Sequence, residues 1–412
     1  RGSSSGEVIV EFDNFIPSNI DPSDEELIHS TPTALSVGRG GLAGVSVGNY
    51  ALFAGGKYGG YPDTLNTVDA YNTSLTRSTP TALSVARYWL TGASVGNYAL
   101  FAGGQSGSAS YRNTVDAYNA SLARSTPTAL SVARHGLAGA SVGNYALFAG
   151  GQSGSSSYSS TVDAYNTSLT RSTPTALSVA RYWLTGASVG NYALFAGGQS
   201  GSASYRNTVD AYNASLTRST PTTLSVGRYG LAGASVGNYA LFAGGYAGTS
   251  GHRDTVDAYD TSLTRSTPTS LSVGRTDLAG ASVGNYALFA GGRASSSSYR
   301  NTVNAYDTSL TRSTPTSLSV ARAYLAGASV GNYALFAGGG GSSGHRDTVD
   351  AYDTSLTRST PTTLSVARYG LAGASVASYA LFAGGYGASP DYKDTVDAYD
   401  TSLTRSTPTA LS

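Results

Sequence analysis

Apolar residues gather in short clusters along the whole chain, and the clusters repeat. The stretch YALFAGG ends at Gly56 and recurs, ending at Gly104, Gly151, Gly198, Gly245, Gly292, Gly339 and Gly385. Successive copies lie 46–48 residues apart, a period that is typical of solenoids and propellers and too long for a coiled coil. The chain therefore contains eight repeats.

Each repeat predicts four short strands, which we name a to d. In one unit they are LAGASV (231–236), YALFA (239–243), TVDAY (255–259) and RSTPTSLS (265–272). They are rich in Val, Tyr, Phe and Thr and are separated by Gly, Asn, Ser and Asp, as strands and turns are. Gly237 and Asn238 tolerate the positive φ of a tight hairpin, so strands a and b are expected to be antiparallel neighbours.

Strand b carries apolar residues on both of its faces. In YALFA the two alternating sets are both apolar, the pattern of a strand that is buried on both sides. A single four-stranded sheet cannot bury two faces, whereas sheets stacked radially can cover each other. The sequence therefore predicts an all-β fold, an eight-bladed β-propeller of four-stranded antiparallel blades.

The repeat resembles the Kelch repeat. The resemblance rests on the Gly-Gly pair that closes strand b, the loop after it, the VDAYD segment, and a fourth strand that leads to an Arg before the next strand a. It covers about residues 28–412 and implies a Kelch-like β-propeller. The Trp that is usual in a Kelch fourth strand is replaced by RSTPTALS. Arrays of YALF and TSLTRSTPTALS also resemble uncharacterised proteins of gut bacteria and their prophages, which implies surface exposure.

Two regions are expected. Residues 1–27 carry seven acidic residues against Arg1 as the one strong cation, so they predict an acidic N-terminal segment or linker, with EVIVEF as a further candidate strand. Residues 28–412 predict the propeller. They hold nine d segments for eight blades, from HSTPTALS (29–36) to RSTPTALS (405–412). We expect overlapping terminal strands to close the ring, with either copy in the last outer position, unless further repeats follow Ser412.

Composition excludes several classes of function. A net charge of +1 with 12% charged residues provides no field for nucleic acid or an anionic membrane. No apolar run is long enough to insert in a bilayer, and the lack of cysteine removes thiolate catalysis and the thioether of copper oxidases that resemble galactose oxidase. We expect a monomer without a cofactor.

A catalytic constellation is not evident. The four histidines do not have zinc-motif spacing, although the loop motif SGHRD at His252 and His345 could hold a metal. The repeated Arg before strand a and the repeated Asp of strand c predict structural pairs. The chain is therefore expected not to be an enzyme, with a hydrolase or lyase of unfamiliar type as the third hypothesis.

The repeats differ mainly in the d-to-a and b-to-c loops, which an antiparallel blade places on one face. Tyr, Trp, Arg and His among Ser and Gly are typical of adaptable recognition surfaces, although exposed loops also vary without constraint. The predicted ligand-binding residues are Tyr88, Trp89, Tyr111, Arg112, His135, Tyr158, Tyr182, Trp183, Tyr205, Arg206, Tyr229, His252, Arg253, Tyr299, Arg300, Tyr324, His345, Arg346 and Tyr369.

These observations favour a non-enzymatic binding module, outside the cell, on a cell surface or on a phage particle, that recognises glycan or protein. The alternative is a structural spacer or assembly module. Residues 67–122 and 161–216 are identical, which predicts two equal aromatic and basic clusters around Trp89 and Trp183, unless these side chains pack inward between blades. On the opposite face, the Asn of NTS and NAS segments is expected to serve turns rather than glycosylation.

Overall fold

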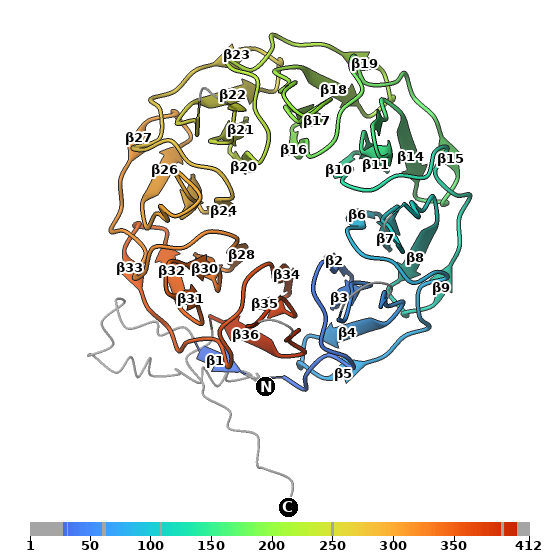
Figure 1. The fold of residues 1–412 in the computed structure, drawn as a ribbon, viewed down its shortest axis with the longest axis horizontal. Helices are drawn as coiled ribbons and strands as arrows, with labels where there is room; N and C mark the ends of the chain where they lie inside the picture. The colour runs from blue at the N-terminus through green and yellow to red at the C-terminus, as the bar shows by residue number, and fades with distance from the viewer. Residues whose placement is uncertain are drawn as a thin grey trace, which may run out of the picture.

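The computed structural model describes residues 28–30, 32–59, 63–107, 109–248, 251–388 and 391–401, and eight four-stranded antiparallel sheets stand around a common axis (Figure 1). The predicted all-β, eight-bladed propeller is therefore confirmed. The acidic segment 1–27 with its candidate strand, and the last d segment 405–412, lie outside the described residues. Within them, no helix has the length and apolarity to cross a membrane.

Each blade runs from its innermost strand a to its outermost strand d. Blade 1 holds β2 (Ala43–Val47), β3 (Tyr50–Ala54), β4 (Val68–Asn72) and β5 (Arg77–Ser78); blade 2 holds β6 (Thr91–Val95), β7 (Tyr98–Ala102), β8 (Val115–Asn119) and β9 (Arg124–Ser125). Blade 3 holds β10 (Ala138–Val142), β11 (Tyr145–Ala149), β14 (Val162–Asn166) and β15 (Arg171–Ser172); blade 4 holds β16 (Thr185–Val189), β17 (Tyr192–Ala196), β18 (Val209–Asn213) and β19 (Arg218–Ser219).

The second half of the ring repeats this order. Blade 5 holds β20 (Ala232–Val236), β21 (Tyr239–Ala243), β22 (Val256–Asp260) and β23 (Arg265–Ser266); blade 6 holds β24 (Ala279–Val283), β25 (Tyr286–Ala290), β26 (Val303–Asp307) and β27 (Arg312–Ser313). Blade 7 holds β28 (Ala326–Val330), β29 (Tyr333–Ala337), β32 (Val349–Asp353) and β33 (Arg358–Ser359); blade 8 holds β34 (Ala372–Val376), β35 (Tyr379–Ala383), β36 (Val396–Asp400) and β1 (Ile28–Ser30). Two b-to-c loops contain a short hairpin. In blade 3 it is formed by β12 (Gln152–Gly154) and β13 (Ser157–Tyr158), and in blade 7 by β30 (Gly340–Gly341) and β31 (Gly344–His345).

The N-terminal copy of strand d closes the ring. Strand β1 pairs antiparallel with β36, with His29 opposite Tyr399 and Ser30 opposite Ala398. It therefore occupies in blade 8 the place that Arg77 and Ser78 occupy opposite Tyr71 and Ala70 in blade 1. This is one of the two possibilities that the sequence left open for the last outer position, and Figure 1 shows β1 at the outer edge of blade 8, next to β36.

The d segments are shorter strands than the sequence predicts. In the seven described segments that begin with Arg-Ser, only this pair joins the sheet ladder, and in the first copy Ile28–Ser30 does so. The remaining residues, TPTALS and its variants, cross to the next blade and bind it. In the first copy, Thr33 O accepts a hydrogen bond from the hydroxyl of Tyr71 (2.6 Å), and Ala34 O accepts one from Arg77 (2.6 Å). Each segment is thus an edge strand for one blade and a clamp for the next.

The core lies between blades rather than within them. Leu52 and Ala54 of blade 1 pack in one cluster with Phe101 of blade 2, and Leu83 of the connecting segment completes it. In β3, Ala51, Leu52, Phe53 and Ala54 are all fully buried, as the two apolar faces of strand b predict. Leu35 and Phe53 pack with Leu381 of blade 8 in the same way, so the closing junction has the same apolar packing.

The innermost strands are joined by a closed series of serine hydrogen bonds. The hydroxyl of each serine donates to the backbone carbonyl of the serine one blade earlier, at 2.6–2.9 Å from Ser94 through Ser375. Ser46 donates to Ser375 O and completes the circle. Glycine allows this approach, because a Cβ on Gly186 would lie 2.5 Å from Gly139 O. The small residues of strand a therefore let adjacent blades bond to each other directly.

A buried arginine joins each blade to its predecessor. The backbone of Arg39 bonds to Lys393 O and to Gly385 N in blade 8, while its side chain enters blade 1 and reaches Asp69 Oδ2 at 2.7 Å and Phe53 O at 3.0 Å. The backbone and hydroxyl of Ser36 also donate to Asp69. Equivalent fully buried ion pairs, at 2.7–2.8 Å, are Arg87–Asp116, Arg134–Asp163, Arg181–Asp210, Arg228–Asp257, Arg322–Asp350 and Arg368–Asp397. The structural role predicted for these repeated charges is confirmed.

Blade 6 departs from this scheme. Its buried arginine, Arg275, donates to the neutral amide oxygen of Asn304 at 2.9 Å, and Asn304 Nδ2 is buried without a hydrogen-bond partner. Burial without a carboxylate at this position lowers the pKa of Arg275 to about 10. The junction of blades 5 and 6 therefore holds a buried cation that lacks the counter-charge present at the equivalent position of every other described junction.

Asn304→Asp should stabilise the protein. The substitution supplies the missing carboxylate and removes the unpartnered amide, and hydrogen bonds to charged groups contribute about 1.5–3 kcal/mol. We expect the free energy of unfolding to rise by that order in chemical denaturation. The reverse substitution in the preceding blade, Asp257→Asn, is the matched control and should lower it. An unchanged or lower stability of Asn304→Asp would contradict this account of the junction.

Candidate binding face

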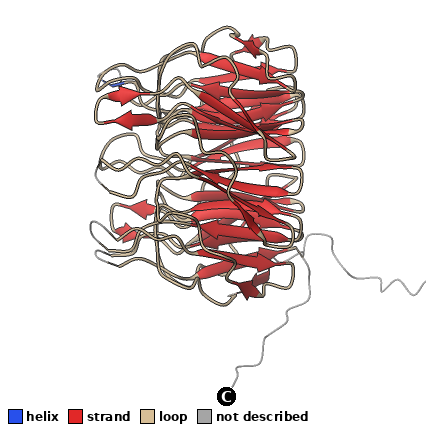
Figure 2. Ribbon diagram, turned by 90° about the vertical axis from the view of Figure 1, so that its right-hand side faces the viewer, coloured by secondary structure: helices blue, strands red, loops and turns tan. Residues whose placement is uncertain are grey.

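The d-to-a and b-to-c loops lie together on one face of the disc, which we call the loop face. Figure 2 shows these long loops gathered on one side and the short turns on the other. The backbone of Tyr88, in a d-to-a loop, forms a β-bridge with Gln105 of the adjacent b-to-c loop, and Gln105 forms a second β-bridge with Tyr111. Equivalent bridges recur around the ring, so the sequence correctly placed both variable loops on one surface.

One position of the d-to-a loop has a left-handed backbone in every blade. It is glycine in four blades, at Gly41, Gly136, Gly230 and Gly370, with φ of 61–68°. In the other four it is Trp89, Trp183, Asp277 and Tyr324, with φ of 50–57°. Glycine adopts this conformation freely, whereas a bulky side chain there is an outlier that costs on the order of 1 kcal/mol or more.

Three of these four side chains are also exposed. Trp89 and Trp183 are each 47% exposed and Tyr324 is 37% exposed. Leucines on the opposite face also have a left-handed backbone. Unlike the tryptophans, residues such as Leu122 and Leu216 pack against the apolar clusters between blades, and this packing accounts for their conformation. The inward packing considered for the tryptophans is wrong, since about half of each side chain remains accessible.

The first aromatic group, which we call the Trp89 group, consists of Lys57, Tyr88, Trp89, Tyr111 and His135. Trp89 stacks on His135 with ring centroids 5.7 Å apart, and Tyr111 stacks on the same imidazole at 5.1 Å. Lys57 Nζ lies 5.3 Å from the ring centre of Tyr88. Burial lowers the pKa of His135, so this imidazole is a neutral member of the stack at pH 7.

The second group, the Trp183 group, consists of Tyr158, Tyr182, Trp183, Tyr205, Tyr229, Tyr246 and His252. Tyr158 stacks on Tyr182 at 5.0 Å, while Trp183 and Tyr205 both stack on Tyr229, at 5.5 and 5.7 Å. This group differs from the Trp89 group because each tryptophan stacks on a residue of the following blade, His135 or Tyr229, outside the duplicated block. The two clusters are therefore not the equal pair that the duplication predicted.

The third group, the Tyr324 group, consists of Asp277, Arg293, Tyr324, His345, Tyr369, Tyr386 and Tyr392. Arg293 Nε donates to Asp277 Oδ2 at 2.7 Å, and its guanidinium lies 5.1 Å from the ring centre of Tyr324. His345 and Tyr386 both stack on Tyr369, at 4.8 and 5.2 Å. This group combines the ion pair with a continuous aromatic surface over blades 6 to 8.

The predicted arginines of the b-to-c loops are not part of these stacks. Arg112 Nε donates to Ser106 Oγ at 2.8 Å, and Arg206 Nε donates to Ser200 Oγ at 2.6 Å, each within its own loop. Arg253, Arg300 and Arg346 are partly buried, and each of their backbone amides bonds to the Gly-Gly pair of the same blade. Tyr299 pairs through its backbone with Arg293. The cations beside aromatic rings are instead Lys57 and Arg293, which the sequence did not single out.

A pocket of about 440 Å³ opens at the junction of blades 5 and 6. Loops of blade 5 line it with Tyr229, Tyr246 and His252, and loops of blade 6 line it with Thr276, Asp277, Arg293, Ser295 and Ser296. Burial, with Arg293 as a smaller cause, lowers the pKa of His252. In the described part of the chain, no group of three or more His, Asp or Glu side chains is placed to hold a metal ion.

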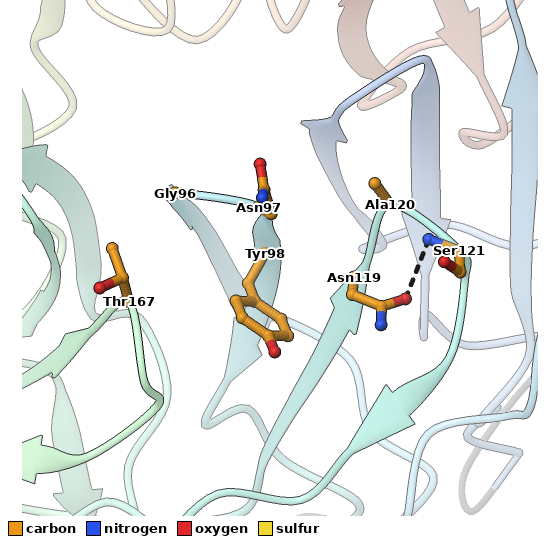
Figure 3. Close-up of a pocket in the computed structure, with 7 residues that line it drawn as sticks. All are labelled: Gly96, Asn97, Tyr98, Asn119, Ala120, Ser121 and Thr167. Atoms are coloured by element: carbon orange, nitrogen blue, oxygen red, sulfur yellow. Dashed lines mark hydrogen bonds between the residues drawn. The ribbon is translucent and has the colours of Figure 1, made fainter.

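Two further pockets, of about 500 and 550 Å³, lie on the opposite face, in blades 2 and 4. Figure 3 shows the first, between the turn at Gly96–Tyr98 and the turn at Asn119–Ser121, with Thr167 of the next blade beside it. Asn119 Oδ1 accepts hydrogen bonds from Ser121 N and Ala123 N, so the predicted turn role of this asparagine is confirmed. Both pockets are lined by turn residues that nearly every blade repeats, which gives them little individual chemistry.

Comparisons with known proteins bear on the fold alone. No protein-family model and no curated protein matches the chain. Among solved structures it is similar to that of YjhT, with a TM-score of 0.51 and 12% sequence identity over 80% of this chain and 99% of that one. This likeness supports the propeller architecture.

Proposed function

We propose that the protein is a non-enzymatic binding module whose loop face engages glycan or protein. The observation that carries this proposal is the retention of Trp89, Trp183 and Tyr324 at a left-handed position that glycine fills in other blades. These side chains are 37–47% exposed, so packing offsets the strain of their backbone only in part. Strained and exposed aromatic residues are a recurrent feature of binding sites.

The groups around these residues support recognition of a ligand. Aromatic faces provide rigid contact area, and the neighbouring serine hydroxyls, Lys57 and Arg293 provide hydrogen bonds to its polar groups. The Kelch-like character of the repeat, and a location outside the cell or on a phage particle, belong to this proposal and rest on the resemblance described above.

Trp89→Gly and Trp183→Gly should weaken binding without loss of stability. Each variant copies the residue that four other blades carry and relieves a left-handed tryptophan, so the melting temperature should stay level or rise. The two tryptophans lie two blades apart on a rigid ring, and loss of such paired contacts can reduce avidity by about 100-fold. On a glycan and peptide array, each single variant should bind a few-fold more weakly than the parent, and the double variant should show about that loss.

The matched control is Ala120→Thr, which places on the opposite face the residue found at the same turn in blade 1. It should leave array binding unchanged. A double tryptophan variant that binds like the parent, or a parent that binds nothing on the array, would contradict the proposed function.

A further inference from the structure

At four junctions between blades on the loop face, two aromatic rings stack on each other, and they come from the same two loop positions each time. One ring comes from a b-to-c loop and the other from the first residue after the buried arginine of the next blade. The pairs are Tyr111–His135, Tyr158–Tyr182, Tyr205–Tyr229 and His345–Tyr369, with centroids 4.8–5.7 Å apart. At these junctions the two rings occupy the space between adjacent blades.

The junction of blades 5 and 6 lacks the second ring. His252 occupies the b-to-c position, but the residue that would stack on it is Thr276. Its short side chain is buried and donates to Gly230 O at 3.1 Å. The pocket of about 440 Å³ described above opens at this junction and is lined by Thr276, and its volume lies within the range of small-molecule sites, about 300–1,000 Å³.

The lining of this pocket is electrically balanced. Asp277 and Arg293 form an ion pair at 2.7 Å, with their side chains 22% and 32% exposed, and His252 is neutral at pH 7. An anionic or cationic ligand would therefore meet one like charge in the site. A neutral ligand that both donates and accepts hydrogen bonds would meet none.

We propose that this pocket binds a neutral saccharide unit, with its ring packed against the part of Tyr229 and Tyr246 that lines the pocket and its hydroxyl groups bonded to Asp277 and Arg293. Adjacent hydroxyls of one sugar ring can donate to a carboxylate and accept from a guanidinium at the same time. The Tyr229 and Tyr246 rings provide apolar surface for the C–H groups of the sugar. Thr276, Ser295 and Ser296 place further hydroxyls along the wall.

The backbone around the pocket disfavours a peptide ligand. Tyr246 pairs with both Tyr229 and His252, and Arg293 pairs with both Thr276 and Tyr299. The central residues of these bridges, Tyr246 and Arg293, therefore have backbone partners on both sides and cannot pair with an extended peptide as an added strand would require. The inference rests on the proposed function and names the ligand class for one part of the same face.

Thr276→Tyr is the primary test, because it restores the ring found at Tyr229 and Tyr369 and fills the pocket. The probes are methyl glycosides of glucose, galactose, mannose and N-acetylglucosamine, measured by titration calorimetry and saturation-transfer NMR. At least one should bind the parent protein. Thr276→Tyr should weaken it roughly tenfold or more by displacing the ligand and its hydrogen bonds, while the melting temperature is maintained.

Two further variants test the polar contacts without threatening the fold. Asp277→Gly relieves a left-handed residue and copies four other blades, and Arg293→Gln copies Gln105 and Gln199. Each should weaken the bound glycoside by a similar factor. The Trp89→Gly variant, whose tryptophan stacks on His135 outside this pocket, should bind the glycoside as the parent does, so failure of this site and failure of the tryptophan contact give different results.

The proposal is overturned if none of the four glycosides binds the parent protein, or if Thr276→Tyr binds as tightly as the parent. Tighter binding of methyl glucuronide than of methyl glucoside would also overturn it, because the pocket would then select an anion. Preferential binding of short peptides at the same residues would assign the site to a different ligand class and overturn it as well.

Discussion

Asp116→Ala is expected to lower the free energy of unfolding by about 3–5 kcal/mol, the cost of breaking a buried ion pair by removing one partner. The substitution leaves the fully buried Arg87 without its carboxylate at 2.7 Å. It also removes the acceptor for the backbone and hydroxyl of Ser84. Chemical denaturation followed by tyrosine and tryptophan fluorescence would measure the loss.

Asp116→Asn is the matched control, since it recreates at blade 2 the arrangement that Arg275 and Asn304 form in blade 6. The amide keeps an acceptor for Arg87 and Ser84, so this variant should lose less stability than Asp116→Ala. Equal stabilities of the alanine variant and the parent would refute the role of the ion pair in joining blades.

Removal of residues 1–36 together with 402–412 is expected to open the ring. The first deletion removes β1 from β36 and takes Leu35 out of the junction of blades 8 and 1. It also removes the acceptors that Thr33 and Ala34 offer to Tyr71 and Arg77. Loss of a buried leucine side chain alone costs about 2–5 kcal/mol, so the combined loss should exceed that of any single substitution above. Small-angle scattering should show an expanded particle, and the thermal transition should fall and broaden.

The two single deletions test which terminal segment closes the ring. Removal of residues 402–412 should leave the melting temperature unchanged, because β1 already occupies the outer position of blade 8. Removal of residues 1–36 should be tolerated better than the double deletion, because RSTPTALS (405–412) repeats HSTPTALS (29–36) in all but its first residue. A double deletion that melts like the parent would show that ring closure does not depend on this segment.

The fold could be predicted because each repeat requires a neighbour on both sides. The two apolar faces of YALFA need a sheet against each of them, and in β3 both faces are fully buried. The length of strand d could not be predicted from strand-forming residues alone. Its proline follows the Arg-Ser pair after one residue and cannot donate to a sheet ladder, so the chain leaves the sheet there and becomes a clamp.

The candidate site was predicted only in part. The variation between repeats placed the aromatic residues on one face. It did not predict their stacking partners, because each partner is supplied by the next blade. Trp89 therefore stacks on His135 and Trp183 on Tyr229, although the sequences around the two tryptophans are identical. Asp277 and Arg293 lie 16 residues apart in sequence, and neither residue alone predicts the ion pair that they form. The signal that could have found them is the exception at Thr276 and Asp277, the one d-to-a loop with an acidic residue.

The duplicated stretch of sequence does not coincide with one blade, because the d segments connect neighbouring blades. The identical blocks 67–122 and 161–216 start in strand c of one blade and stop after strand c of the next, so neither block corresponds to one blade. Each contains the connecting d segment and its polar contacts to the next blade, with Arg87, Asp116 and the Tyr118 contact to Thr81 in the first block and their counterparts in the second. The apolar partners of the same junction, such as Leu52 and Ala54, come from the preceding strand b, outside the block. Because YALFA is identical in all eight repeats, a copied block meets the same apolar partners after any blade, and the number of blades can change without a change in the junction.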